Sequence, residues 1–170
     1  MPEQARVAAA LTVTVCLANI LLSPTVTNKK DEQGSSVIKS YSVWNYYNED
    51  EKIVSTESYR NGVKDGVWKN YYANGIVSRE AVWKNGKMNG TYKEFFDDGK
   101  PKISSTMKSN DLDGMTILYH PDGKVWMKGN YKNGLKEGIW NLFKPDGTKD
   151  TDEVYKNGDL VKPENAGGKQ

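Results

Sequence analysis

The chain has 170 residues, and its 24 lysines and arginines nearly balance 22 aspartates and glutamates, giving a formal net charge of +2. Charges of both signs are interspersed and no basic run is long, so we expect neither nucleic acid nor an acidic substrate as a ligand. The single cysteine, Cys16, lies in an apolar N-terminal stretch, which excludes disulfides, CxxC chemistry and thiolate metal sites from the rest of the chain.

The N-terminus predicts an export or membrane segment. A weakly basic start precedes the apolar run Val7–Leu22, and a polar stretch follows from Asn28. This pattern is typical of a cleaved signal peptide, and the run is only slightly shorter than the roughly 17–25 residues of a spanning helix. We therefore assign residues 1–27 to a signal peptide or a membrane anchor. Either one predicts an extracytoplasmic location (periplasmic, secreted or membrane-anchored), whereas a segment with neither role predicts a cytoplasmic one.

The remaining chain divides into a linker, a repeat region and a tail. Residues 28–40 are polar and contain glycine and serine, which predicts a flexible linker. Residues 41–161 hold an internal repeat of 24 residues, and residues 162–170 are predicted to be a disordered tail. The five copies are 42–65, 66–89, 90–113, 114–137 and 138–161.

Several columns of residues recur at this spacing. Two are glycines: Gly66, Gly90, Gly114 and Gly138, and then Gly75, Gly99, Gly123 and Gly147. Two are mainly aromatic: Tyr47, Tyr71, Phe95, Tyr119 and Phe143, and then Tyr59, Trp83, Met107, Tyr131 and Tyr155. We expect these two aromatic rows to supply most of the stability, through ring burial between neighbouring copies.

Each copy has the pattern of a β-hairpin. Short runs of β-compatible residues are bounded by Asn-Gly or Asp-Gly pairs, such as Asn74-Gly75 and Asp98-Gly99. These pairs favour the positive φ angles of type I′ hairpin turns. The predicted fold class is therefore all-β: an elongated, single-layer antiparallel β-meander of tandem hairpin repeats, preceded by an N-terminal apolar helix or signal segment. Ten strands at ~4.8 Å spacing predict a sheet roughly 45 Å wide.

No residue pattern indicates catalysis or metal binding. His120 is the only histidine, and we interpret it as one variable member of the column that also holds Tyr72 and Phe96. Asp111 and Asp113 resemble part of a calcium loop but lack its further ligands, so a connecting loop is the better interpretation. We expect no cofactor, metal or small-molecule substrate, and an envelope hydrolase is disfavoured because no acid–base set is present.

Two surfaces are candidates for binding. The candidate interaction residues are Trp68, Tyr72, Tyr92, Phe96 and Trp140. Exposed rings of this kind anchor protein partners, although they equally suit a structural role in covering the sheet. The second surface is a row of lysines that favours either solubility or contact with anionic lipid: Lys84, Lys108, Lys132 and Lys156.

At these residues the chain resembles the MORN-2 repeats of bacterial YwqK-like proteins, which are often labelled antitoxin components of toxin–antitoxin systems. The motif Y-x-N-G-x-x-x-G-x-W-x-x-Y-Y-x-N-G is carried by Tyr59–Gly75 and recurs at Trp83–Gly99 and Tyr131–Gly147. The resemblance implies a non-catalytic protein-binding role, with a cognate toxin or an envelope protein as partner. The alternative is a membrane-associated scaffold that uses the N-terminal segment and the lysine row.

Overall fold

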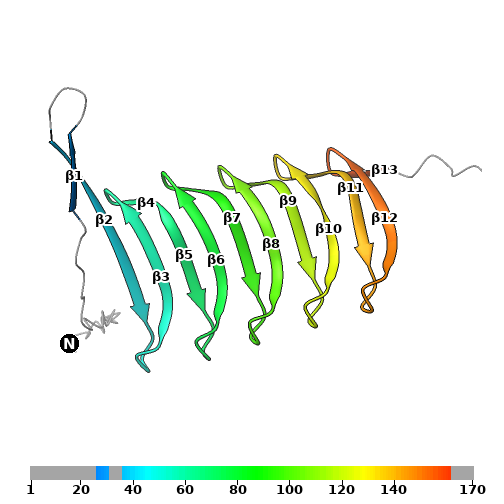
Figure 1. The fold of residues 1–170 in the computed structure, drawn as a ribbon, viewed down its shortest axis with the longest axis horizontal. Coiled ribbons are helices and arrows are strands. Elements are labelled where there is room, and N and C mark those ends of the chain that lie inside the picture. Colours follow the sequence, from blue (N-terminus) through cyan, green and yellow to red (C-terminus); the bar gives the residue numbers. More distant parts are fainter. Residues whose placement is uncertain (1–25, 31–35, 162–170) are drawn as a thin grey trace, which may run out of the picture.

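The computed structural model describes residues 26–30 and 36–161, and within them it is an all-β, open antiparallel sheet (Figure 1). The strands lie side by side in chain order, in one layer. They are β1 (Val26–Lys30), β2 (Ser36–Tyr47), β3 (Ile53–Arg60), β4 (Val63–Lys64), β5 (Gly66–Tyr71), β6 (Val77–Lys84), β7 (Lys87–Phe95), β8 (Pro101–Lys108), β9 (Asp111–Tyr119), β10 (Val125–Lys132), β11 (Leu135–Phe143), β12 (Lys149–Lys156) and β13 (Asp159–Val161).

The predicted meander of five hairpins is confirmed. The pairs β2–β3, β5–β6, β7–β8, β9–β10 and β11–β12 are the hairpins, and each pairs with the next. The signal or anchor assignment falls mainly on residues 1–25, which lie outside the described residues, as does the predicted tail. In the described part, no helix is both long enough and apolar enough to cross a membrane.

The prediction of a flexible linker over residues 28–40 was wrong for most of that segment. β1 pairs with the first part of β2, from Val26 opposite Ser40 to Lys30 opposite Ser36. Val37 and Ile38 give this stretch β propensity, and an added strand satisfies the backbone groups that β2 would otherwise present at an open edge. Polar composition alone concealed this pairing.

The turns at the two ends of the strands are of different types, so the type I′ prediction holds at one end only. The row of turns at one end of the strands is called an edge of the sheet below. At Asn61-Gly62 and Asn85-Gly86 both residues have positive φ, as type I′ requires. At the opposite edge, Gly75 has a φ of +84° while Asn74 is not in that region. There the Asn74 carboxamide oxygen accepts a hydrogen bond from the Ile76 amide instead. The aspartates at this edge act in the same way through their carboxylates: Asp98, Asp122 and Asp146.

In three of the four full repeats, the first glycine is required both by its backbone angle and by a close neighbouring strand. Gly66, Gly90 and Gly114 have φ values of +113°, +131° and +118°. A Cβ at these positions would lie 2.9–3.1 Å from a Cβ on the neighbouring strand. Glycine is therefore the residue type that accommodates both the dihedral angle and the close strand.

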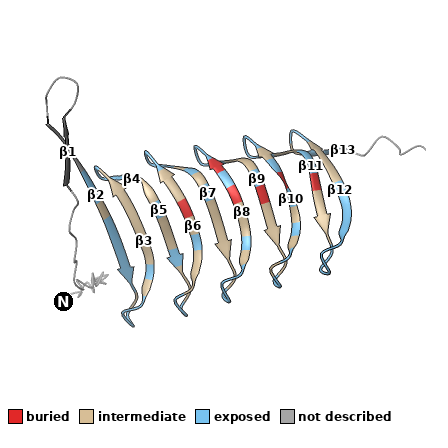
Figure 2. Cartoon of the chain, in the orientation of Figure 1, coloured by how far each residue is buried: buried red, intermediate tan, exposed pale blue. Residues whose placement is uncertain are grey.

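The most buried side chains form a row of mostly small residues across the middle of the sheet (Figure 2). The register places Trp68 opposite Ala81, Ala81 opposite Tyr92, and so on through the following strands. The row continues as Ser105, Thr116, Gly129 and Trp140. The large rings of this row are thus separated by one or more small residues, which leave room for the rings against the sheet.

The expectation that the two aromatic columns supply most of the ring burial is only partly confirmed: Met107, of the second column, is buried, but the other most buried residues belong to neither column. Members of one column lie two strands apart, at roughly 9.6 Å, which exceeds the 4.5–7 Å of a ring contact. The observed ring contacts join different columns: Trp68 lies 5.4 Å from Tyr59 and 5.2 Å from Trp83 between ring centroids. Tyr47, a member of the first predicted row, is 46% exposed.

We predict that Gly129→Ala destabilises the C-terminal half of the sheet. An added Cβ would lie 2.3 Å from the Trp140 indole, and Gly129 has no positive φ, so the effect is steric. Overpacking of this kind costs about 2 kcal/mol or more, which urea unfolding followed by tryptophan fluorescence would measure. Adding Trp140→Leu should recover part of the loss, because the smaller side chain makes room for the methyl group. Additive losses in the double variant would contradict this explanation.

Candidate functional site

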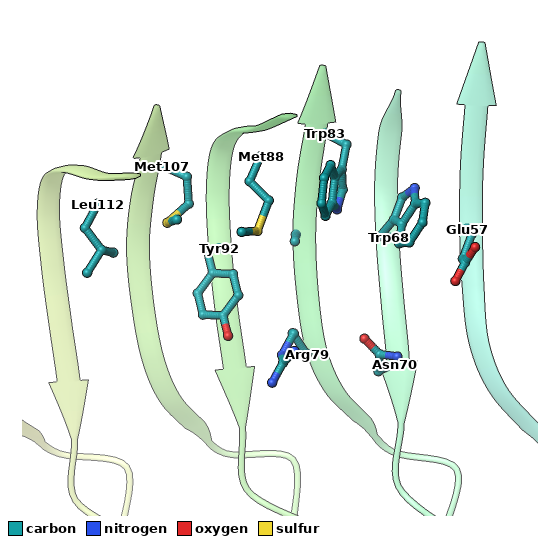
Figure 3. Close-up of a pocket in the computed structure, with 10 residues that line it drawn as sticks. Glu57, Trp68, Asn70, Arg79, Trp83, Met88, Tyr92, Met107 and Leu112 are labelled. Carbon is teal, nitrogen blue, oxygen red and sulfur yellow. The ribbon is translucent and has the colours of Figure 1, made fainter. Parts of the chain in front are cut away.

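One face of the sheet carries an open hollow of about 500 Å³ over strands β3 to β9 (Figure 3). It lies on the face that holds the most buried row. Its lining residues are Glu57, Trp68, Asn70, Arg79, Ala81, Trp83, Met88, Tyr92, Met107 and Leu112.

The depth of the hollow comes from the small side chain of Ala81. Ala81 pairs with Trp68 on one side and Tyr92 on the other, so a methyl group lies between two large rings. Above it, Trp83 is opposite Met88 on β7, and Met107 is opposite Leu112 on β9. The floor and this wall are therefore apolar, as in most ligand and side-chain pockets.

The opposite wall is polar and charged. Asn70 and Arg79 are cross-strand partners, and the Arg79 side chain is 55% exposed. Its guanidinium lies 3.8 Å from the Glu94 carboxylate, which is also 3.7 Å from the Lys102 ammonium. Because the Arg79–Glu94 pair is long and solvent-exposed, it contributes little to stability. This leaves Arg79 able to reorient toward a bound acidic group.

Two tyrosines on this face donate a hydrogen bond from the hydroxyl group to a neighbouring carboxylate. Tyr59 donates a hydrogen bond to Glu57 at 2.7 Å, and Tyr92 donates one to Glu94. Burial, together with the hydrogen bond and the negative charge of the adjacent glutamate, raises the pKa of each phenol to about 12. These tyrosines therefore stay neutral well above their usual range.

The candidate residues from the sequence divide into two groups. Trp68 and Tyr92 line the hollow. The Tyr72 hydroxyl donates a hydrogen bond to the Phe95 carbonyl at 2.7 Å. Because Phe95 belongs to the next repeat, this bond links two neighbouring hairpins. Trp140 is 0% exposed and lies over Gly129, so the structure contradicts its proposed role at an interface. Phe96 occupies the same repeat position as Tyr72, beside the hairpin tip, and this column of Tyr72, Phe96 and His120 is called the tip column. Phe96 is half-buried and does not line the hollow.

Sequence reasoning missed most of the wall of the hollow. Trp83 and Met107 were assigned to a structural row, and Arg79 and Leu112 were not selected. Strand alternation gives the face within one strand. Which residues lie opposite each other depends on turn length and on a bulge such as that between Ala81 and Trp83.

The interpretation of His120 as a member of the tip column is consistent with its contacts. Its Nε2 donates a hydrogen bond to the Phe143 carbonyl at 3.1 Å, which is the contact that Tyr72 makes with Phe95 two repeats earlier. Asp113 accepts a hydrogen bond from the Asn133 amide at 3.3 Å, so it organises a turn. Among the residues that the structure describes, no three His, Cys, Asp or Glu side chains are grouped to hold a metal ion.

The exposed lysine row lies at one edge of the sheet. Its members occupy the C-terminal ends of β6, β8, β10 and β12, where all are exposed: Lys84, Lys108, Lys132 and Lys156. None forms an ion pair with a residue of the range 41–161. This geometry suits either solubility or contact with an anionic surface.

The fold and the hollow define an open β-repeat protein that presents one aromatic face. Three segments match the MORN repeat variant, namely residues 64–85, 88–109 and 112–133. Residues 64–133 therefore carry three MORN-type repeats, and the same succession of hairpins extends beyond them at both ends. No curated protein matches the chain.

We predict that the protein loses stability between pH 10 and 12 partly through Tyr59 and Tyr92. Below pH 10 both phenols keep their protons in the folded and unfolded states. Between about pH 10 and 12 the unfolded chain releases them while the fold retains them, so the free energy of unfolding falls. Urea unfolding at several pH values should show a shallower fall for the double variant Tyr59→Phe and Tyr92→Phe. Equal slopes in the two proteins would contradict the prediction.

Proposed function

We propose that the chain is a non-enzymatic module that binds a protein partner through the face carrying the hollow. MORN repeats are commonly modules that bind proteins or membranes. The observation that supports a protein partner here is the hollow itself, where two indoles, a phenol and an exposed guanidinium surround an apolar floor. Tryptophan, tyrosine and arginine are the residue types that dominate binding energy at protein interfaces.

The shape of the site supports the insertion of side chains from a partner. The hollow has a volume of about 500 Å³. Among the residues that the structure describes, no second layer covers this face of the sheet. An apolar side chain of the partner would pack between Trp68, Trp83 and Met88. An acidic residue beside it would then reach Arg79, which satisfies charge at the rim and hydrophobic contact at the centre.

A narrower proposal concerns where the protein acts and on what. The apolar segment Val7–Leu22 supports export or membrane anchoring. The resemblance to antitoxin components supports a cognate toxin or an envelope protein as partner, in an immunity-like role. A small toxin or secreted effector encoded beside this chain would support that role.

A membrane-surface scaffold is the second candidate function. Its support is the row of four exposed lysines, which lies on one edge where an anionic bilayer would contact several repeats together. Each lysine near such a surface contributes about 1 kcal/mol of attraction. This candidate requires the edge of the sheet, whereas the first requires its face.

The two candidates are distinguished by matched variants of the full chain. Met88→Glu places a charge in the hollow, while Thr91→Glu places the same charge on the opposite face of the same strand. We expect a protein that the wild-type chain retains to bind Thr91→Glu equally and Met88→Glu at least about tenfold more weakly. Isothermal titration with the purified partner would measure both affinities.

A contrary result would take one of two forms. A partner that binds both variants equally would show that the hollow is not its site. Alternatively, sedimentation with anionic vesicles that is lost when the four lysines are changed to glutamine, together with no face-dependent protein partner, would support the scaffold.

A further inference from the structure

The repeat array binds two of its own lysines between aromatic rings. The Lys64 ammonium lies 4.1 Å from the centroid of the Trp68 ring and 4.6 Å from that of Trp83. Three repeats further along the chain, the Lys136 ammonium lies 4.5 Å from the centroid of the Trp140 ring and 4.4 Å from that of Tyr155. These distances are within the range of cation–π attraction. The face therefore has a recurrent ammonium site built from the same two repeat positions.

The lysine position itself varies among the copies. In the middle repeats it is held by Met88 and Leu112, which line the hollow with their apolar chains. In the first hairpin the corresponding residue is Ser40, whose side chain is too short to cover a ring. The ring positions of that hairpin are still aromatic, since Trp44 and Tyr59 occupy the places of Trp68 and Trp83. The first copy thus keeps the rings without the lysine.

The register places a carboxylate among these rings. Trp44 is opposite Glu57, and Tyr46 is opposite Ser55, so both rings share the face of Glu57 and Tyr59. The Glu57 carboxylate accepts a hydrogen bond from the Tyr59 hydroxyl at 2.7 Å. Within residues 41–161 it forms no ion pair. A negative charge beside aromatic faces is the environment that attracts an ammonium group.

The rings of the first hairpin are also more open to solvent than their equivalents. Trp44 is 40% exposed, whereas Trp140 at the equivalent repeat position is fully buried. Tyr46, which has no aromatic equivalent in the later copies, is 45% exposed. Tyr47 and Trp126 are comparably exposed, at 46% and 43%, so exposure alone does not define a site. The further feature at Trp44 and Tyr46 is the Glu57 carboxylate on the same face of the sheet. This cluster is called the Trp44 site below and consists of Trp44, Tyr46, Glu57 and Tyr59.

We propose that the Trp44 site binds a lysine side chain of the protein partner, in the way that the face already binds Lys64 and Lys136. This inference rests on the proposed function and names one chemical feature of the partner. The alkyl stem of the lysine would pack along the Trp44 indole, and its ammonium would reach the Glu57 carboxylate. The site is adjacent to the hollow, because Glu57 also lines the hollow's edge. A partner would therefore present an apolar side chain and a lysine to neighbouring hairpins.

The test uses the full chain and a minimal probe, Nα-acetyl-lysine methylamide. The probe is titrated into protein labelled with ¹⁵N, and the indole N–H signals of the tryptophans are followed by NMR. We expect a saturable shift of the Trp44 signal with a dissociation constant of roughly 10 mM or weaker, because a single amine makes few contacts. The matched control is the norleucine analogue, which has a similar apolar stem and no charge, and which should give no saturable shift.

Three variants locate the binding. Glu57→Gln removes the charge while retaining an acceptor for Tyr59, so it should abolish or strongly weaken the shift of the Trp44 signal. Trp44→Ala removes the ring itself, so the probe should no longer shift the backbone amide signals of Glu57 and Tyr59 that it shifts in the wild-type chain. Lys64→Ser empties the internal lysine position, so the probe should now also shift the Trp68 and Trp83 signals. Unchanged backbone amide spectra away from the substitution show that each variant is folded.

Several outcomes would overturn the inference. Equal shifts by lysine and norleucine probes would show an apolar surface only, and an unshifted Trp44 signal would show no site. Binding to phosphatidylcholine vesicles through Trp44, without binding of the lysine probe, would assign the site to a lipid headgroup. The lysine inference can fail while the proposed function stands. This is the outcome if Met88→Glu abolishes partner binding and Trp44→Ala leaves it unchanged.

Discussion

A single-layer sheet has no second layer to cover its rings, and this constraint governs the rest of the structure. Residues at equivalent positions in successive hairpins lie two strands apart, too far for their side chains to touch. Contact depends on what the intervening strand provides. Where it provides Gly129, the Trp140 indole packs against the backbone of that strand and is fully buried. Where it provides Ala81, the Trp68 ring remains partly exposed and lines the hollow. Ring burial therefore depends on small residues in the strands between the rings.

The hydrogen bonds between repeats follow the same logic, because each hairpin can contact only its neighbours. Tyr72 and His120 reach the carbonyls of Phe95 and Phe143 at one edge. At the other edge, the Gly86 and Gly134 amides donate to the Lys64 and Leu112 carbonyls. Polar side chains at the tips thus hold the hairpins in register, which leaves the middle of the face available for binding.

The sequence predicted the periodic part of this structure and missed the part that depends on pairing. Five hairpins, their order and the glycine positions follow from the 24-residue spacing. The core row did not, because Ala81, Ser105 and Thr116 are not individually hydrophobic landmarks and gain their meaning from the strands beside them. Of the ten residues that line the hollow, Trp68 and Tyr92 are expected from the sequence because they are large rings. Arg79 belongs to the site only through its register with Asn70.

Departures from the repeat, more than the repeat itself, create the distinctive chemistry of the face. A perfect array would place the same residue over every pair of rings. Here that position changes from serine to lysine to methionine to leucine and back to lysine, at Ser40, Lys64, Met88, Leu112 and Lys136. Lysine closes two ring pairs from within the chain. Methionine and leucine instead give the middle repeats an apolar hollow, and serine leaves the rings of the first hairpin exposed beside Glu57. One backbone plan thus presents chemically different surfaces along its length.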